Sequence, residues 1–259
     1  MELAQALQVQ SRVVYALILR ETRSRYGNSK LGFFWALFEP FAHIAVFMTI
    51  FSALGRAIPI GDSMGVFILT GIAPWLLFNN IVTGIMGGVD GNRPLLGYPQ
   101  VMPMDTMIAR ILLESSTIII IFLLFMGLAL NFGFTIEIDD VLMMMSSAGI
   151  LVVLAAGVGM INAAIKLYYP SYATIYSAFS RPFYFMSGIF FTADFLSPEV
   201  LGLIDFNPIL HMVEWFRSGF YRSFNSEFYD INYVITTTLI IFIIGLMAER
   251  ATRKRARQI

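Results

Sequence analysis

Six stretches of the chain consist almost entirely of apolar residues, and each is long enough to cross a bilayer, which takes about 20 such residues. They are rich in Ile, Leu, Val, Phe and Met, and none alternates apolar and polar positions with a period of two. The pattern predicts transmembrane helices and argues against an outer-membrane β-barrel. The predicted spans cover residues 33–54, 64–88, 107–130, 141–165, 175–195 and 231–248.

The first 30 residues carry a different pattern, in which apolar positions recur at helical spacing between polar residues such as Gln8 and Arg12. This predicts an amphipathic helix that either lies in the cytoplasmic membrane interface or packs on the surface of the bundle. We therefore expect an all-α polytopic membrane protein forming a single domain over 1–259. Its parts are an interfacial helix in 1–30, a six-span bundle in 31–248 and a basic cytoplasmic tail in 249–259.

The composition supports a membrane protein, because 58% of the residues are hydrophobic and 13% are charged, against about 25% charged in soluble domains. The chain has no cysteine, and its two histidines, His43 and His211, are far apart. We therefore expect neither a metal site nor a catalytic residue.

The basic residues predict the orientation, because cytoplasmic loops of membrane proteins carry an excess of Lys and Arg. With six spans and the N-terminus in the cytoplasm, 14 of the 17 Lys and Arg residues fall on the cytoplasmic side. Only Arg56, Arg217 and Arg222 fall outside. Both termini are therefore predicted to be cytoplasmic.

Two connections between spans are unusual. The cytoplasmic loop 89–105, VDGNRPLLGYPQVMPMD, contains three prolines and two glycines, yet it carries several apolar side chains. Apolar side chains in such a loop indicate either a docking element for a soluble partner or a loop packed on the membrane surface. The outer segment 194–230 is too apolar for free solvent and is broken by Pro198 and Pro208, so we expect a re-entrant or interfacial helical pair there.

Some polar and aromatic residues inside the spans are candidates for a transport path. Glu39 and His43 share one face of the first span, and Glu114 lies one turn after Arg110. Aromatic residues form a stripe around the start of the fifth span, and tyrosine rings suit contact with sugars. Structural pairing and helix packing remain the alternatives. The stripe consists of Tyr172, Tyr176, Phe179 and Phe183.

Small residues in the spans indicate close helix contacts, within one subunit or between two. Gly84 and Gly88 are four residues apart, and a cluster of small residues lies at 155–159.

The chain contains no G-x-x-x-x-G-K-[ST] phosphate-binding loop and no stretch of soluble sequence long enough for a nucleotide-binding domain. If transport uses ATP, the ATPase must be another chain. No basic and aromatic surface indicates binding to nucleic acid.

The entry to the first span has the pattern R-Y-x-x-S-x-L-G-x-x-W-x-x-x-x-P. Its residues are Arg25, Tyr26, Ser29, Leu31, Gly32, Trp35 and Pro40, with Glu39 before the proline. This pattern resembles the entry of the first span in ABC-2 type permeases, which export capsular polysaccharide, O-antigen and teichoic acid from bacteria. The form GFFWALFEP is most similar to the capsule-exporting branch.

The resemblance implies a multi-pass permease of the bacterial inner membrane that is not itself an enzyme. It implies a homodimer with two cytoplasmic ATPase subunits, which hold ATP and Mg²⁺, and a periplasmic co-export protein. The substrate would be a lipid-linked, acidic polysaccharide. The loop after the second span would contain the helix that couples to the ATPase, with the contact residues Asp90, Arg93, Pro94, Leu95, Leu96, Tyr98 and Pro103.

The same resemblance suggests a path for the glycan. Basic residues at the inner mouth would attract an acidic substrate, and aromatic residues would let a repeating chain slide. The expected path residues are Arg25, Lys30, Phe33, Trp35, Glu39, His43 and the aromatic stripe Tyr172, Tyr176, Phe179 and Phe183.

Three alternatives remain at this stage. The first is an ABC-2 exporter of O-antigen, teichoic acid, lipid or drug. The second is an intramembrane glycan-modifying transferase, for which Glu39 and His43 are the one candidate pair. The third is a proton-coupled carrier, which usually has repeated halves with broken helices; we find no such repeat.

Overall fold

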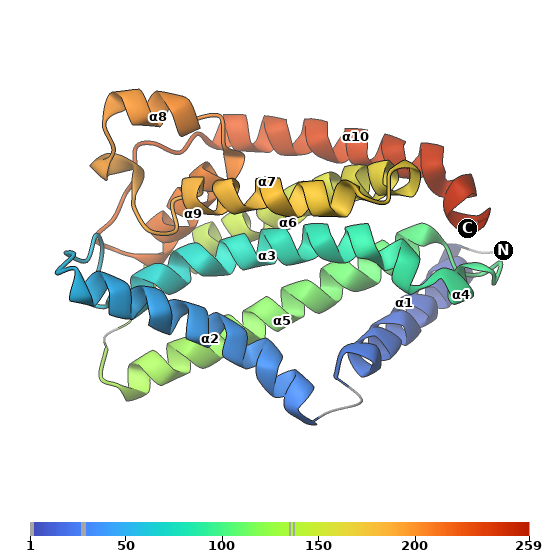
Figure 1. Cartoon of the computed structure of the whole chain (residues 1–259), viewed down its shortest axis with the longest axis horizontal. Coiled ribbons are helices and arrows are strands. Elements are labelled where there is room, and N and C mark those ends of the chain that lie inside the picture. Colours follow the sequence, from blue (N-terminus) through green and yellow to red (C-terminus); the bar gives the residue numbers. More distant parts are fainter. Residues whose placement is uncertain (1–2, 27–29, 135, 137, 259) are drawn as a thin grey trace.

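The computed structural model describes residues 3–26, 30–134, 136 and 138–258, without the side chains of residues 3, 4, 6, 25, 26, 30–33, 35–37, 257 and 258. The described part is almost entirely helical (Figure 1). Its helices are α1 (Leu3–Tyr26), α2 (Lys30–Ala53), α3 (Met64–Gly91), α4 (Arg93–Leu96), α5 (Pro103–Asn131), α6 (Val141–Tyr168), α7 (Tyr172–Met186), the 3-10 helix η1 (Ala193–Phe195), α8 (Pro198–Ile204), α9 (Pro208–Phe220) and α10 (Ile231–Gln258).

Helix α3 is the central helix of the bundle and packs against α5, α6 and α9 (Figure 1). Of its most apolar stretch, 83% is buried, against 17–33% for the other long apolar helices of the described chain. Its side chains Phe67, Ile68, Ile81 and Ile85 have no exposed surface. The surrounding helices α5, α6 and α10 instead keep large apolar faces exposed, as expected where lipid rather than water is the solvent.

Glycines bring α6 and α10 into backbone contact, as the cluster of small residues predicted. A Cβ atom added at Gly157 would lie 2.8 Å from the Cα of Phe242, and one added at Gly245 would lie 2.6 Å from the carbonyl oxygen of Gly157. On another face of α6, a Cβ at Gly159 would lie 3.0 Å from the side chain of Ile85 of α3. These contacts lie within one chain.

Four helices in the described part are long and apolar enough to span a membrane: α3, α5, α6 and the 231–256 part of α10. They include the predicted spans 64–88, 107–130, 141–165 and 231–248 and extend beyond them by one to ten residues at one or both ends. Helix α2 agrees with the predicted span 33–54, and its described apolar stretch is Phe38–Ala53. The chain is therefore a polytopic helical membrane protein.

The prediction of one continuous helix over 175–195 is wrong. Helix α7 has 15 residues, which at 1.5 Å per residue is about 22 Å, short of the roughly 30 Å of a hydrocarbon core. It contains Pro182 and ends at Met186, and Gly188 then adopts a φ of 71°, which turns the chain. An irregular segment, 187–192, leads to η1.

Arg217 of α9 holds this irregular segment. Its guanidinium is fully buried and donates hydrogen bonds to the carbonyl oxygens of Gly188 (2.6 Å), Ile189 (3.0 Å) and Phe191 (2.9 Å). It also donates to the carbonyl oxygen of Phe67 in α3 (3.3 Å). One side chain thus ties the end of α7 to α9 and α3, and it satisfies carbonyl groups that no helix pairs.

The predicted outer helical pair is present as α8 and α9, separated by Asp205, Phe206 and Asn207. The two helices differ in exposure: every residue of α9 from Ile209 to Phe220 is buried, whereas α8 is mostly exposed. Helix α9 is therefore part of the core, packed on α6 and α3.

The N-terminal segment forms the predicted amphipathic helix. Helix α1 buries Val14 and Leu17, at 8% and 3% exposure, and packs mainly against α5, while Gln8, Arg12 and Tyr15 are exposed. It lies at the end of the bundle where α4 is found and where α10 finishes (Figure 1). We call this the hairpin end, and the opposite end, with α8, the far end.

Replacing Arg217 is expected to lower the stability of the bundle strongly. Arg217→Ala leaves the carbonyls of Gly188, Ile189 and Phe191 without this donor and the fully buried Glu214 without its cation, a loss of about 3–5 kcal/mol for a buried charge network. Arg222→Ala, at an exposed position just after the same helix, should stay within about 0.5 kcal/mol. Thermal unfolding of the detergent-solubilised variants measures both, and equal melting temperatures would refute the anchoring role of Arg217.

Candidate functional site

The hairpin between α3 and α5, residues 92–102, is a compact structure built on two buried polar residues. Asn92 donates from its amide to the carbonyl oxygen of Gly88 (2.8 Å), which closes the end of α3. Asp105 accepts from the backbone N–H of Met102 (2.9 Å) at the start of α5. Between them Pro94 lies in the first turn of α4, where its missing N–H costs nothing. The hairpin therefore has a defined shape.

Helix α1 forms hydrogen bonds with both sides of this hairpin. Arg20 donates to the Asn92 side chain (2.5 Å) and to the carbonyl oxygen of Gly91 (3.1 Å). On the other side Gln10 donates to the carboxylate of Asp105 (3.1 Å). Since α1 packs on α5 as well, it and the hairpin form one body.

An ion-pair cluster lies directly behind the hairpin. Arg110 of α5 pairs with Glu21 of α1, and both side chains are only 11–13% exposed. Arg110 also lies 3.9 Å from Glu114, so the pairing within α5 expected from the sequence is present but is the longer of the two contacts. The partner on α1 was not expected, because nothing in the sequence places residue 21 beside residue 110.

Helix α6 holds the end of α3, next to the hairpin. Lys166 pairs with Asp90 at 2.8 Å and donates to the carbonyl oxygen of Met86 (3.3 Å). Asp90 also pairs with Arg93 at 2.8 Å, so one carboxylate lies between two cations. Beside this cluster, the guanidinium of Arg255 near the end of α10 stacks over Tyr168, 4.3 Å from the ring centroid.

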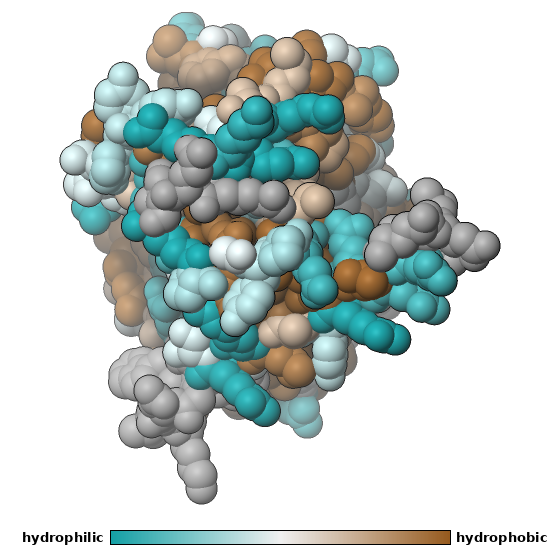
Figure 2. All heavy atoms as spheres, turned by 90° about the vertical axis from the view of Figure 1, so that its right-hand side faces the viewer, coloured by the Kyte–Doolittle hydropathy of each residue, from teal (hydrophilic) through white to brown (hydrophobic). Residues whose placement is uncertain are grey.

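The basic residues predicted for the cytoplasmic side thus gather at the hairpin end, as the contacts of Arg20, Arg93, Arg110 and Lys166 indicate. Figure 2 looks onto this end and shows hydrophilic side chains collected over it, with apolar ones around them.

The expected contact residues of the hairpin fall into two groups. Tyr98 is 61% exposed, and Asp90, Arg93 and Pro94 are also at the surface. Leu96, at 4% exposure, and Pro103 lie inside the fold, and Leu95 is partly buried against the core. Leu96 and Pro103 are therefore anchors of the hairpin, and the surface available to a partner is smaller than we expected.

The aromatic stripe of α7 also divides. Tyr172 donates to the side-chain oxygen of Asn162 in α6 (3.0 Å), and Tyr176 packs against the core. Phe179 and Phe183 point outward, with 66% and 36% of their surface exposed. In this chain the two tyrosines fix α7 to the bundle, and the two phenylalanines present a free aromatic face.

The remaining path candidates lie on α2 or before it. His43 forms a 2.7 Å hydrogen bond with the hydroxyl of Tyr184, which joins α2 to α7, and Glu39 is exposed one turn away. Tyr184, which stands next to Phe183 in the same aromatic row of the sequence, was not expected as the partner of His43. The side chains of Arg25, Lys30, Phe33 and Trp35 lie outside the described residues.

Among the residues that the structure describes, no group of three or more His, Asp or Glu side chains could hold a metal ion. At the Glu39 and His43 pair, His43 bonds to the hydroxyl of Tyr184 and stacks on Phe47.

The described chain is a polytopic helical bundle in which the amphipathic helix α1 holds the hairpin between α3 and α5. The sequence pattern of the ABC-2 type transporter family matches residues 12–221. The chain belongs to this family.

Among the individual proteins to which the chain is similar is the polysialic acid transport protein KpsM of Escherichia coli, with 33% identity over 96% of both chains. The capsule polysaccharide export inner-membrane protein BexB of Haemophilus influenzae is 28% identical over 94% of this chain and 92% of its own. The capsule polysaccharide export inner-membrane protein CtrC of Neisseria meningitidis is 24% identical over 93% and 91%.

Removing the charge of Glu21 should loosen α1 from the bundle. Glu21→Gln weakens a largely buried ion pair, and opening of α1 should rise about tenfold. Trypsin cleavage after Arg12 and Arg20 in the detergent-solubilised chain measures this opening, and it should speed up by the same factor. Glu39→Gln, an exposed carboxylate on α2, is the matched control, and a Glu21→Gln rate equal to that control would contradict the anchoring of α1.

Proposed function

We propose that the chain is the membrane permease of an ATP-binding cassette exporter that moves capsular polysaccharide across the bacterial inner membrane. The observation that carries the proposal is its membership of the ABC-2 family together with 33% identity, over 96% of both chains, to a polysialic acid transport protein. BexB and CtrC, named for capsule polysaccharide export, support the same substrate class. Export of O-antigen, teichoic acid, lipid or drug is the alternative within the family.

The proposed topology has six membrane crossings, with both termini and the hairpin in the cytoplasm. It rests on the gathering of basic side chains at the hairpin end and on the rule that such residues stay inside. The fifth crossing would combine α7 with the irregular segment 187–192, whose carbonyls Arg217 satisfies. The single domain over 1–259 belongs to the same proposal.

The energy source in this proposal is a separate ATPase that binds ATP and Mg²⁺ and docks on the hairpin. The chain has no phosphate-binding loop of its own. The hairpin is suited to transmit a movement of the ATPase to the bundle, because α1 and the α6 contact beside it hold it in place. It also exposes a tyrosine, Tyr98, to a partner. A tyrosine can fill an apolar cleft and still form a hydrogen bond at its rim.

The assembly that we propose is a homodimer with two ATPase subunits and a periplasmic co-export protein. A single bundle with a core as filled as that around α3 leaves little room for a polymer, so a path between two copies related by a two-fold axis is favoured. The exposed residues Phe179 and Phe183 of α7 would contact the glycan there, and Glu39 and His43 would lie on the neighbouring helix.

The function itself is tested by reconstitution. The purified chain in liposomes, with its cognate ATPase and ATP, should translocate a lipid-linked capsular polysaccharide, and the polysaccharide should stimulate ATP hydrolysis. Transport without nucleotide or ATPase would refute the proposal. Stimulation by O-antigen or by drugs, but not by capsular polysaccharide, would favour the alternative exporters.

Tyr98→Ala should uncouple the motor from the permease. Because the side chain is 61% exposed, its loss should leave the bundle intact and lower ATP-driven export about tenfold or more, as for a hot-spot tyrosine. Phe206→Ala, an exposed aromatic residue at the far end, is the control and should export normally. Parental export by Tyr98→Ala would remove Tyr98 from the docking surface.

Leu96→Asp does not make a clean version of this test, because it would bury a charge and disturb the hairpin itself.

The exposed half of the aromatic stripe gives a separate test of the path. Phe179→Ala combined with Phe183→Ala should slow export several-fold while assembly with the ATPase is unchanged, because both rings face outward. Phe195→Ala, an exposed ring beyond α7, is the control. Export at the parental rate by the double variant would assign these rings to packing.

A further inference from the structure

Helix α7 carries a polar stripe on its outer surface, beside the exposed rings of Phe179 and Phe183. The stripe consists of Thr174, Ser177 and Arg181, which recur at helical spacing and are all exposed. The hydroxyl of Ser177 donates to the carbonyl oxygen of Thr174 (2.9 Å), so it bonds within its own helix. Arg181 is therefore the one charged group of this stripe.

Arg181 lies deep along the helix. The orientation predicted from the sequence counts it on the cytoplasmic side, but the structure places it nine residues after Tyr172, where α7 begins. Nine residues of helix rise about 14 Å, close to half of the roughly 30 Å hydrocarbon core. Within the described part of the chain, the guanidinium forms neither an ion pair nor a hydrogen bond. A charged side chain at such depth almost always borders water or another polar group.

The exposed faces of α5 and α10 show what this chain presents to lipid. Over 112–128 of α5 and 235–247 of α10, the exposed large side chains are all apolar, and no exposed residue is charged. The outer face of α7 differs from them by its exposed arginine. It is therefore better suited to a water-filled space than to lipid.

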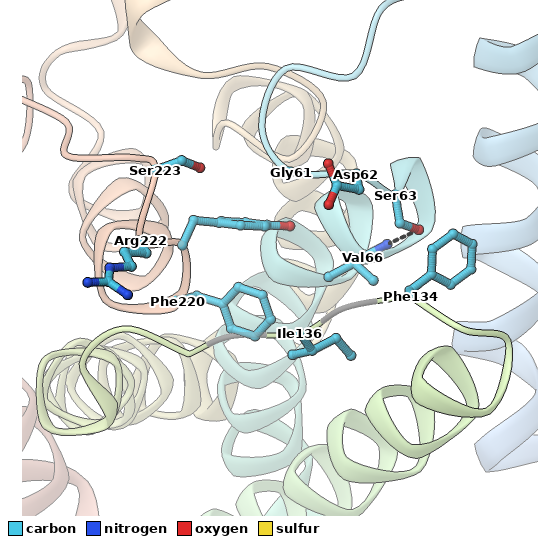
Figure 3. A pocket seen from close by; sticks show the side chains of 10 residues that line it. Gly61, Asp62, Ser63, Val66, Phe134, Ile136, Phe220, Arg222 and Ser223 are labelled. Carbon is cyan, nitrogen blue, oxygen red and sulfur yellow. Dashed lines mark hydrogen bonds between the residues drawn. The ribbon is translucent and has the colours of Figure 1, made fainter.

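Two hollows in the described chain lie elsewhere. One, of about 430 Å³, lies at the far end between the loop before α3 and the segment after α9, with Arg222 on one side (Figure 3). The other, of about 420 Å³, lies between α2 and α5. Neither is lined by a residue of α7. The water that Arg181 needs thus lies along the outer face of α7, where a second copy would enclose it under the proposed function.

We propose that Arg181 binds the anionic groups of the exported polymer inside the membrane. This inference rests on the proposed export of a glycan and names the chemistry by which the path recognises it. A guanidinium binds a carboxylate through two parallel hydrogen bonds. The substrate is then a polysaccharide with an acidic group in its repeat, because a neutral glycan would leave the arginine without a counter-ion at this depth.

The contact suits a chain that moves. An ion pair in contact with water is weak, so each acidic group can leave Arg181 as the next one arrives. The exposed rings of Phe179 and Phe183 lie beside the arginine on the same helix and can contact the sugar rings between the acidic groups. Two copies related by a two-fold axis would present two such surfaces to one polymer.

Single cysteines test the place of Arg181, because the chain has no cysteine of its own. Ser177→Cys, one turn before Arg181, is compared with Leu239→Cys on the exposed apolar face of α10. The chain and its ATPase are reconstituted in phosphatidylcholine vesicles and treated with a sulfonate-bearing methanethiosulfonate. Ser177→Cys should react about tenfold faster or more, because the reactive thiolate forms in water and not in hydrocarbon. Equal rates would overturn the proposal.

The charge of Arg181 is tested in the Ser177→Cys chain. Arg181→Gln should lower the ratio of the rates of anionic and cationic thiol reagents about tenfold, as expected for a unit charge roughly 6 Å away in water. Arg181→Lys should keep most of the ratio. Arg222→Gln, at an exposed arginine of the far end, should leave it unchanged. A ratio unaffected by Arg181→Gln would overturn the proposal.

A lipid phosphate is the other anion that could reach this arginine. Phosphatidylglycerol added to the vesicles should leave the difference between Arg181 and Arg181→Gln as it was. Loss of that difference would assign the arginine to a lipid headgroup and overturn its assignment to the polymer.

Acidic and neutral polymers test the ligand. The probes are polysialic acid and the same polymer with its carboxylates reduced to alcohols, and the readout is stimulation of ATP hydrolysis. Arg181→Gln should raise the half-maximal concentration of the acidic polymer about tenfold, the effect of one ionic hydrogen bond, and leave that of the reduced polymer unchanged. An equal effect on both polymers would overturn the proposal. Failure of both to stimulate the parent would count against the proposed function, while the cysteine experiments decide the place and charge of Arg181.

Discussion

The architecture depends on one buried guanidinium. A chain that leaves regular helix inside a bundle exposes carbonyl groups that water cannot reach, and such groups must be satisfied from within. Arg217 does this for three carbonyl groups of segment 187–192 and reaches α3 at the same time. Because of it, α7 can stop early and α9 can enter the core. Without it, the carbonyl groups of this segment would be buried without a donor, and the far end would lose stability.

The hairpin end is held by several side chains, whereas the far end depends on one arginine. Asn92 and Asp105 shape the hairpin, and Arg20 and Gln10 tie it to α1. Lys166 ties the adjoining end of α3 to α6, and Asp90 links that end to Arg93 of the hairpin. The hairpin is thus connected to α1 directly and to α6 through the last turn of α3. A docking surface that must transmit force needs such connections.

Apolar periodicity predicted the long helices well, because about 20 apolar residues in a row have few other solutions. It failed at 175–195, where composition looked like a span but the helix ends at Met186 and Gly188 turns the chain. The candidate site was predicted in part. The loop composition pointed to the hairpin, but only packing could tell that Leu96 faces inward while Tyr98 faces outward. Contacts such as Glu21 with Arg110 join residues 89 positions apart and leave no periodic trace.

Helix α3 has a further geometric consequence. It begins after Ser63 at the far end and finishes before Asn92 at the hairpin, so a single helix of 28 residues, about 42 Å long, joins the two ends of the bundle. Each residue of an α-helix turns by about 100°. One residue inserted in its middle would therefore swing the hairpin by over a quarter of a circle relative to the opposite tip. The number of residues in α3 is therefore as constrained as the identity of any side chain on it.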